Sequence, residues 1–292
     1  MKETTGSVLN CFSVDVEGFV ESNEDSFPIP ASFKDPQRER IEIERNMDAL
    51  LRLLSGSGVR GTFFFVGRIA RDMPELLRCT SSEGHELGLH SYEHRRIWKT
   101  TADTFARGIR EAKDRIEQLS GVPVAGFRAP DFSITAHSLW ALDALRETGF
   151  LYDSSIYPIG MHDVYGIPDA QPGIHRLENG LVEFPLSTAS LAGKRFPFGG
   201  GGYFRLFPLF ISMQLLKHLN RRNEPGMFYI HPYEVGPSIP RIRELSLLRQ
   251  FRHYYNCASG AERIARLFRQ FRFGAAIDIL KDRGYINEGM HA

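Results

Sequence analysis

The sequence predicts an α/β protein in which parallel strands are joined by helical crossovers, and its 292 residues are enough to bury a large core. Two observations favour this class. Short apolar runs alternate with amphipathic stretches along most of the chain. Each apolar run also ends on or beside a polar residue, as strands do when their carboxyl ends meet around a site.

Seven apolar runs are predicted to be strands: Val8–Val16, Val59–Val66, Glu86–His90, Gly126–Arg128, Leu151–Ser154, Leu181–Leu186 and Met227–His231. None of them approaches the roughly eighteen apolar residues of a membrane span. We therefore expect no transmembrane segment.

Three amphipathic stretches between the strands share one design, with an apolar stripe at helical spacing and a glycine at the end. The first helix is expected to end at Gly56. The second is expected to run from a capping Thr101 to Gly121, and the third from Thr135 to Gly149. This repetition indicates a recurring strand–helix unit.

Two segments interrupt the rhythm. Ser22–Pro36 holds three prolines and mixed charge, so we expect a long surface loop beside the end of the first strand. The glycine run Gly199–Gly202 lacks the Lys-Ser/Thr of a P-loop, which makes phosphate binding a weak interpretation. The arginine-rich C-terminal stretches are interpreted as solvated helix faces, because Glu and Asp are interleaved with the arginines.

The composition is that of an ordinary soluble protein, with 42% hydrophobic residues, 24% charged residues and a net charge of +1. Because this charge is too small to steer nucleic acid, no nucleic-acid partner is expected. The N-terminus lacks the pattern of a signal peptide, which predicts a cytoplasmic location. Cys11, Cys79 and Cys257 share no disulfide or metal-binding spacing, so we interpret all three as packing residues.

The predicted strand ends carry ionisable residues. Taken alone, each has an ordinary explanation: a carboxylate can cap a helix, a histidine can be a satisfied polar residue, and an arginine can pair with a surface acid. Their coincidence at one edge of the sheet instead indicates a site. The residues concerned are Asp15, Glu17, His90, Arg128, Asp153 and His231.

His90 and His94 are four residues apart, and they would lie on one helical face if the chain turned into a helix at His90. One carboxylate from the first strand would complete a two-histidine, one-carboxylate site for zinc or a related divalent metal. The second carboxylate remains available as a general base, and a separate histidine as a general acid. Such a site would hydrolyse an amide or an ester.

Five motifs occur in the order and spacing of a known family: SVDVEG, HSYEH, FRAPDFS, LYDSSIYP and MFYIHPYE. From about Val8 to Val235 the chain resembles the polysaccharide deacetylase superfamily, the NodB-homology domain of carbohydrate esterase family four. It looks most like the branch of exosortase-associated and O-antigen-locus polysaccharide deacetylases. The resemblance implies a distorted (β/α) barrel with fewer than eight strands. Residues 1–240 would form this catalytic domain, and residues 241–292 a C-terminal helical extension packed on the barrel.

The resemblance also implies roles at the metal site. The metal ligands correspond to Glu17, His90 and His94. The base that activates the attacking water corresponds to Asp15, and its paired arginine to Arg128. The usual motif has two adjacent aspartates, whereas here one residue separates the two acids and the second is a glutamate. The alternative in which Asp15 is the ligand and Glu17 its support therefore stays open. The expected metal is Zn²⁺, with Co²⁺ or Ni²⁺ as alternatives.

Further roles follow from the same resemblance. His231 matches the acid that protonates the leaving amine, and Asp153 the acid that orients this histidine. The backbone N–H near Asp131 matches an oxyanion donor, while the Asp131 side chain is expected either to alter substrate choice or to cap the following helix. We expect Tyr203 to stack on a sugar at the mouth of the site and Tyr233 to line the pocket.

The implied activity is metal-dependent removal of N-acetyl groups from an amino sugar of a cell-surface polysaccharide or its precursor. The expected partners are an N-acetylated sugar, a sugar nucleotide, or a lipid-linked or polymeric glycan. Two alternatives stay open: a deformylase or allantoinase-like amide hydrolase of the same superfamily, and a catalytically decayed sugar-binding protein.

Overall fold

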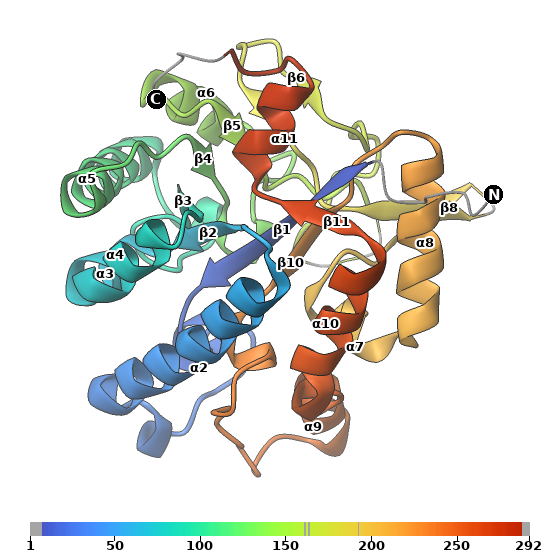
Figure 1. Ribbon diagram of the computed structural model, residues 1–292. Helices are drawn as coiled ribbons and strands as arrows, with labels where there is room; N and C mark the ends of the chain where they lie inside the picture. The colour runs from blue at the N-terminus through green and yellow to red at the C-terminus, as the bar shows by residue number, and fades with distance from the viewer. Residues whose placement is uncertain (1–7, 161, 163, 192, 288–292) are drawn as a thin grey trace.

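The computed structural model describes residues 8–160, 162, 164–191 and 193–287. Its centre is a curled sheet in which seven strands run parallel, in the order β10-β1-β2-β3-β4-β5-β7. Helices surround the outside of this sheet (Figure 1). The seven strands are β1 (Leu9–Val16), β2 (Thr62–Phe65), β3 (Glu86–Leu89), β4 (Gly126–Phe127), β5 (Tyr152–Asp153), β7 (Val182–Glu183) and β10 (Met227–Ile230).

These seven strands correspond one to one to the seven predicted runs, and they confirm the distorted α/β barrel. Two short strands bring this sheet to nine: β6 (His175–Arg176) pairs antiparallel with β7, and β11 (Arg272–Gly274) pairs parallel with β1. β8 (Thr188–Leu191) and β9 (Lys194–Pro197) form a separate two-stranded hairpin. These strands were not predicted, because their sequences contain no continuous apolar run.

The strands are buried on both faces, as their nearly continuous apolar sequence requires. In β2, Phe63 and Phe65 belong to the core between the sheet and the outer helices. Phe64, which points to the opposite face, belongs to a second core that includes Tyr152 and Tyr229. The curl of the sheet therefore encloses an aromatic interior directly below the strand ends that hold the ionisable residues.

The outer helices confirm the repeating strand–helix unit, with some boundaries displaced. They are α2 (Pro36–Ser57), α3 (Gly67–Asp72), α4 (Pro74–Ser82), α5 (Ala102–Ser120) and α6 (Trp140–Glu147). α5 has the predicted ends, because the Thr101 hydroxyl accepts from the backbone N–H of Thr104 and Gly121 follows in the left-handed conformation.

The other two predicted helices differ at their ends. α2 continues past Gly56 and stops at Gly58, whose φ of 64° suits a helix terminus. α6 begins only at Trp140 without a side-chain cap, so the prediction that Thr135 caps it is wrong. The residues before it form hydrogen-bonded turns instead, in which the Ser138 hydroxyl accepts from the N–H of Thr135.

The segment Ser22–Pro36 is less open than predicted. The short helix α1 (Phe19–Asn23) covers its start, a 3₁₀ turn occupies Ala31–Phe33, and Pro36 is the first residue of α2. The Glu39 carboxylate accepts from two backbone N–H groups at the start of α1, at 3.0 and 3.3 Å. This bond ties α2 to the end of β1, where the functional site lies.

The glycine run Gly199–Gly202 packs against β10 and does not have the geometry of a phosphate loop. The carbonyl of Gly199 accepts from the N–H of Tyr229 at 2.8 Å, and Gly200 forms an isolated bridge to the same residue. A Cβ atom on Gly200 would lie 2.0 Å from the Tyr229 carbonyl oxygen, and Gly200 has a φ of 140°. Only glycine permits this close approach, which closes the sheet beside β10.

The C-terminal part of the chain is mainly helical but also contributes to the sheet. Its helices are α7 (Gly201–Leu206), α8 (Leu209–Arg221), α9 (Leu247–Tyr254), α10 (Gly260–Gln270) and α11 (Ala276–Asp282). Strand β11 lies between α10 and α11, so the region after residue 240 is not a purely helical extension as predicted.

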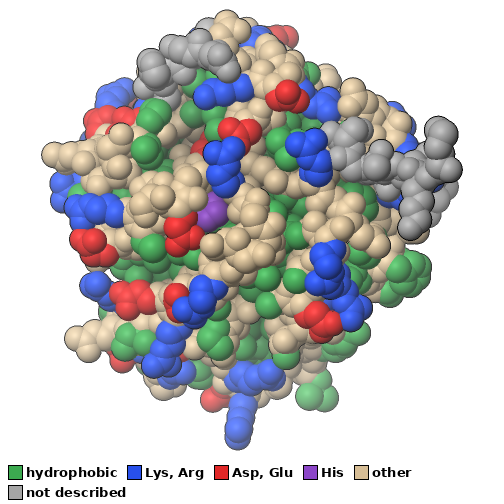
Figure 2. Space-filling view, viewed as in Figure 1, with side chains coloured by type: hydrophobic (Ala, Val, Ile, Leu, Met, Phe, Trp, Pro, Cys, Tyr) green, Lys and Arg blue, Asp and Glu red, His purple; other side chains and the backbone are tan. Residues whose placement is uncertain are grey.

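Two further sequence expectations concern composition. Cys11 and Cys257 are buried, as expected of packing residues, whereas Cys79 is exposed, so its interpretation as a packing residue is wrong. No helix in the described part of the chain combines the length and the apolar composition that crossing a membrane requires. The visible face carries acidic and basic side chains intermixed, in keeping with the small net charge (Figure 2).

Candidate active site

Asp15, near the carboxyl end of β1, is paired with a fully buried arginine. Its Oδ1 atom lies 2.7 Å from Nη1 of Arg128, which also donates to the Ser13 hydroxyl at 2.8 Å. The rest of the guanidinium donates to the carbonyl and hydroxyl oxygens of Ser154, at 3.1 and 3.0 Å. Its central carbon lies 4.3 Å from the centre of the Phe64 ring. Arg128 is thus held from several strands at once and fixes the position of Asp15.

Glu17 lies just beyond β1 with three imidazoles around its carboxylate. Its Oε2 atom is 3.2 Å from Nε2 of His90 and 2.7 Å from Nε2 of His94, and its Oε1 atom is 3.2 Å from Nε2 of His231. Burial opposes ionisation of Glu17, but His94 and His231 outweigh that effect and hold its pKa well below the usual value. The carboxylate is therefore charged although it is only 2% exposed.

His90 and His94 converge through a turn and not through a helix. β3 ends at Leu89, and Ser91 adopts a φ of 64°, in the left-handed region. The Ser91 carbonyl accepts from the N–H of Gly67 at 2.9 Å, which anchors the turn to the start of α3. The helix at His90 that would have placed both imidazoles on one face does not form, but the two imidazoles meet through this turn.

The donor set at this point suits a divalent metal. One ligand atom each from Glu17, His90 and His94 lies within 4.8 Å of the others. Nδ1 of His90 is 2.9 Å from the carbonyl oxygen of Arg128, so Nδ1 carries the proton and Nε2 presents a lone pair toward Glu17. Oε2 of Glu17 has no hydrogen-bond partner among the described residues, despite its short distances to both Nε2 atoms. The lone pairs of Glu17 Oε2 and His90 Nε2 face each other, as the ligands of a bound cation do.

His231, which follows β10, is held on its other side by Glu234. Nδ1 of His231 lies 3.0 Å from Oε2 of Glu234, and this oxygen also accepts from the His231 backbone N–H at 2.9 Å. Oε1 of Glu234 pairs with Nε of Arg205 at 2.6 Å. Tyr233 stacks on the imidazole with ring centres 5.1 Å apart. Burial lowers the pKa of His231, but Glu17 and Glu234 outweigh burial and raise it to about 9.

Asp153 does not occupy the position predicted for it. Its carboxylate accepts from the hydroxyl and backbone N–H of Ser155, at 2.6 and 3.2 Å, and its remaining side-chain partner among the described residues is Glu183. The prediction that Asp153 orients His231 is therefore wrong, because Glu234 already occupies Nδ1. The Ser155 hydroxyl accepts from the N–H of Ala129 at 2.7 Å, so Asp153 supports the segment that carries Arg128.

The three residues predicted to bind substrate lie in different surroundings. Asp131 adopts a φ of 52° and pairs with Nε of Arg96 at 2.7 Å, so it does not cap the following helix. The partly exposed Tyr203 shares a hydrogen bond of 3.0 Å with the hydroxyl of Tyr165. Tyr233 is mostly committed to packing on His231. Of the three, Tyr203 belongs to an aromatic cluster that continues through Tyr165 toward the strand ends.

Several residues of the site were not predicted. Glu234 and Arg205 hold His231, Ser13 and Ser154 hold Arg128, and Glu183 pairs with Asp153. Only Glu234 had a usable signal, because it stands three residues after His231 with a proline directly behind the histidine. At that spacing the two residues form a capping box. The Glu234 carboxylate accepts from the His231 backbone N–H and also pairs with the His231 ring at Nδ1.

A cavity of about 520 Å³ opens beside the site. His94 forms part of its wall, together with charged residues from α1, the start of α2 and the segment after His94. Its charges are largely paired within the protein, as in the 3.0 Å contact between Arg68 and Glu21 and the 2.7 Å contact between Lys99 and Asp25. Through His94, this cavity adjoins the metal-ligand cluster.

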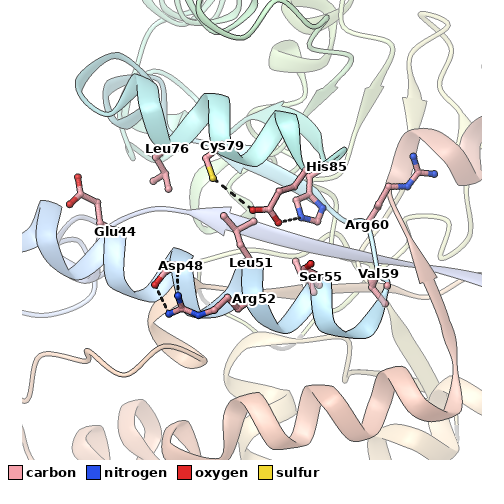
Figure 3. A pocket seen from close by; sticks show the side chains of 13 residues that line it. Glu44, Asp48, Leu51, Arg52, Ser55, Val59, Arg60, Leu76, Cys79 and His85 are labelled. Carbon is pink, nitrogen blue, oxygen red and sulfur yellow. Dashed lines mark hydrogen bonds and ion pairs between the residues drawn. The ribbon is translucent and has the colours of Figure 1, made fainter.

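A second cavity, of about 710 Å³, lies between α2 and α4 on the outside of the barrel (Figure 3). It is lined by ion-paired residues of α2, such as Asp48 and Arg52, and by Cys79 and His85 on the opposite wall. Nδ1 of His85 accepts from the N–H of Gly61 at 3.1 Å. None of the residues that line this cavity belongs to the cluster around Glu17, so it is not the active site.

The fold and site together define an α/β barrel with a polar centre at the carboxyl ends of its strands, the place where enzymes of such architecture keep their active sites. Comparison with family models makes the likeness specific: residues 32–150 match the model of the polysaccharide deacetylase family, so this part of the chain is similar to that family. A second model, a domain of unknown function (DUF3473), matches residues 154–281. The boundary between the two models falls immediately after Asp153.

Individual relatives agree with this family. The peptidoglycan-N-acetylmuramic acid deacetylase PdaA of Bacillus subtilis is 32% identical over 72 residues, which cover 25% of this chain and 27% of that protein. The chain therefore matches only about a quarter of that relative's length. A solved putative polysaccharide deacetylase from Mycobacterium smegmatis has a TM-score of 0.62 at 20% identity, covering 97% of this chain and 92% of that one. The Puue allantoinase structure has a TM-score of 0.64 at 15% identity, with 98% and 94% covered. These two likenesses establish the fold.

Proposed function

We propose that this protein is a metal-dependent N-deacetylase, which hydrolyses the acetamide of an N-acetylated amino sugar to a free amine and acetate. The observation that carries this proposal is the convergence of Glu17, His90 and His94 beside two further acid–base groups, Asp15 and His231. A metal site alone would suit many proteins. A metal site flanked by a base and an acid at opposite sides suits hydrolysis.

Glu17, His90 and His94 would hold the metal. When bound there, a divalent cation acidifies water and polarises the substrate carbonyl. The preceding geometry favours Glu17 over Asp15 as the carboxylate ligand, because Asp15 is engaged with Arg128 while an oxygen of Glu17 faces both imidazoles. Zn²⁺ is the proposed metal, since two imidazoles, one carboxylate and open positions are its usual catalytic ligand set.

Asp15 would act as the general base. Arg128 fixes one of its oxygens at 2.7 Å, which leaves the other free to take a proton from the attacking water. Arg128 is fully buried and its own donors are engaged, so it keeps Asp15 oriented as charge moves.

His231 would act as the general acid. The Glu234 carboxylate, 3.0 Å from Nδ1, favours the imidazolium form, which can donate to the leaving amine. Glu234 fixes Nδ1, so that Nε2 is the atom presented to the site. Its one-fifth exposed side chain is the most open of the residues around Glu17.

The substrate we propose is a glycan of the cell envelope or its precursor, in the manner of the exosortase-associated or O-antigen-locus deacetylases. A curated relative acts on a peptidoglycan N-acetylated sugar, which supports the acetamide chemistry but does not select the glycan. The second candidate is an allantoinase-like amide hydrolase, supported by the fold shared with the Puue allantoinase.

The test compares wild type with a His90→Ala, His94→Ala double variant, with His218→Ala as a control on the exposed surface of α8. Metal content is measured together with acetate release from N-acetylated oligosaccharides and sugar nucleotides. We expect one bound metal and acetate release in wild type and control, and neither in the double variant. Bound metal without acetate release, but with allantoin hydrolysis, would favour the second candidate.

A further inference from the structure

Helix α9 turns its apolar side chains away from the protein. Leu247 is 84% exposed, Leu248 77% and Phe251 53%, and none of the eight residues of the helix is buried. Tyr255, one residue beyond the helix, is 40% exposed. A contiguous group of large exposed apolar side chains is uncommon on a soluble domain and marks an interaction surface.

These side chains form one stripe. With 3.6 residues per turn, positions 247, 248, 251 and 255 fall within about 100° of the helix circumference. The neighbouring helix α10 has the opposite arrangement: Ile264 and Leu267 are buried against the core, while Arg266 and Arg269 face solvent. The apolar stripe of α9 is thus removed from water only if an apolar surface outside this chain covers it.

Basic residues border the stripe. Arg249 and Arg252 are exposed on α9, next to the apolar arc, and Arg241 and Arg243 are exposed just before it. The segment between residues 239 and 256 contains these four arginines and one acidic residue, Glu244, which gives it an excess of three positive charges. Figure 1 places α9 at the lower edge of the molecule, where Figure 2 shows hydrophobic side chains next to basic ones.

We propose that α9 docks this protein onto an anionic lipid membrane, with Leu247, Leu248 and Phe251 entering the headgroup region and the surrounding arginines binding lipid phosphates. An exposed apolar arc beside arginines is the pattern of helices that lie in the membrane interface. A second copy of the chain would fit less well, because a symmetric contact would bring the arginines of both copies together.

The position of α9 links this surface to the active site. Nη1 of Arg205 donates to the backbone carbonyls of Arg252 and His253, at 3.1 and 2.9 Å, while its Nε pairs with Glu234, the residue that holds His231. On the same side, Tyr254 stacks over Phe19 at 6.5 Å, two residues after Glu17. α9 is therefore packed against Arg205, which holds Glu234, and against the segment that follows Glu17.

This placement of α9 selects a substrate class, an inference that rests on the proposed function. An enzyme that lies on a membrane with its site beside the contact helix meets glycans attached to lipid headgroups before it meets free sugars. The substrate we infer is a lipid-linked N-acetylated glycan.

The experiment measures co-sedimentation of the full chain with vesicles of phosphatidylcholine alone or with one-third phosphatidylglycerol. We compare wild type with a Leu247→Ser, Leu248→Ser, Phe251→Ser variant, and with an Arg249→Glu, Arg252→Glu variant. The matched control is Arg266→Glu, Arg269→Glu, which makes the same charge change on α10. Wild type and control are expected to bind the anionic vesicles, and both α9 variants to bind at least tenfold more weakly.

Equal binding by wild type and both α9 variants, or no binding by wild type, would overturn the proposal. A wild-type dimer that becomes monomeric in the triple serine variant would overturn it too, in favour of a second copy. Deacetylation of a soluble N-acetylated oligosaccharide is measured in parallel and should be unchanged in the α9 variants. Vesicle binding without any deacetylation would retain the docking surface and reject the proposed function, so the two failures are distinguishable.

Discussion

Glu17 and Glu183 are equally hidden from solvent at the carboxyl ends of strands, yet their surroundings give them opposite charge states. Glu17 has three imidazoles within 3.2 Å, and its pKa is held well below the usual value. Burial and the neighbouring Asp153 raise the pKa of Glu183 well above its usual value, so Glu183 is protonated. A carboxylate at a strand end thus becomes a cation site or a structural hydrogen-bond donor according to the partners that meet it.

The unpaired oxygen of each acid shows the same contrast. Oε2 of Glu17 and Oε2 of Glu183 both lack a hydrogen-bond partner among the described side chains. For Glu183 the missing partner is a proton, which the acid donates to Asp153. For Glu17 the two nearest atoms are imidazole nitrogens, and Nε2 of His90 presents a lone pair, so this oxygen suits a cation.

The largest expected effect is at Glu17. Replacing it with glutamine removes the charge that the metal and the histidines need while keeping the side-chain shape. We expect loss of bound metal and a fall in kcat on the order of 10³-fold or more, since a catalytic metal supplies several kcal/mol of transition-state stabilisation. Metal analysis and acetate release measure the two losses. A Glu17→Gln protein that retains stoichiometric metal would show that Glu17 is not a ligand.

Asp15→Asn separates base from ligand within the same cluster. Because Asp15 pairs with Arg128 and not with the histidines, the variant should keep its metal. Loss of the base should lower kcat by roughly 10²- to 10⁴-fold, the usual contribution of general acid–base catalysis. Metal lost in parallel with turnover would instead make Asp15 the carboxylate ligand, with Glu17 as its support.

Glu234→Gln tests the orientation of His231. The amide oxygen can still accept from the backbone, but the charge that stabilises the imidazolium is gone. We expect kcat to fall by roughly 10- to 100-fold, the range typical of residues that hold a functional histidine, with KM and metal content unchanged. Asp153→Asn is the informative comparison, since the sequence resemblance gives this role to Asp153 and the structure gives Asp153 no contact with His231. A larger fall in kcat in Asp153→Asn than in Glu234→Gln would show that Asp153, and not Glu234, orients His231.

Sequence reasoning found the seven parallel strands and the residues around Glu17 because both depend on local patterns: apolar runs, and ionisable groups where those runs end. It could not find how the residues are held. The left-handed conformation of Ser91 and the packing of Gly200 on Tyr229 depend on contacts between distant parts of the chain. The pairing of His231 with Glu234, three residues away, instead of with Asp153 is a choice between two acids. No periodic pattern in a sequence reports a residue with a strained backbone, and none tells which of two acids will pair with a histidine.

The smallest effect on activity, and the sharpest test of the contrast, is expected from Glu183→Gln. Burial raises the pKa of Asp153 from 3.8 to about 6, and that of Glu183 further, so the folded protein binds more protons at this pair than the unfolded chain does. Stability contributed by the pair is therefore complete at about pH 4 and is lost as pH rises through 6. At about 1.4 kcal/mol per pKa unit, the loss is on the order of 2 kcal/mol or more.

Glutamine donates to Asp153 from its amide without needing a proton, so the variant should lose less stability over the same pH range. Urea unfolding at pH 4.5 and pH 7.5 measures this difference, with Glu178→Gln as an exposed control on the same β6–β7 connection. Acidic groups whose pKa is lower in the folded protein, such as Glu17, increase the stability as pH rises. They do so equally in wild type and variant, so their contribution cancels when the two pH dependences are compared. If wild type and Glu183→Gln show the same pH dependence, the pair does not share a proton, and Glu183 would be a charged acid like Glu17.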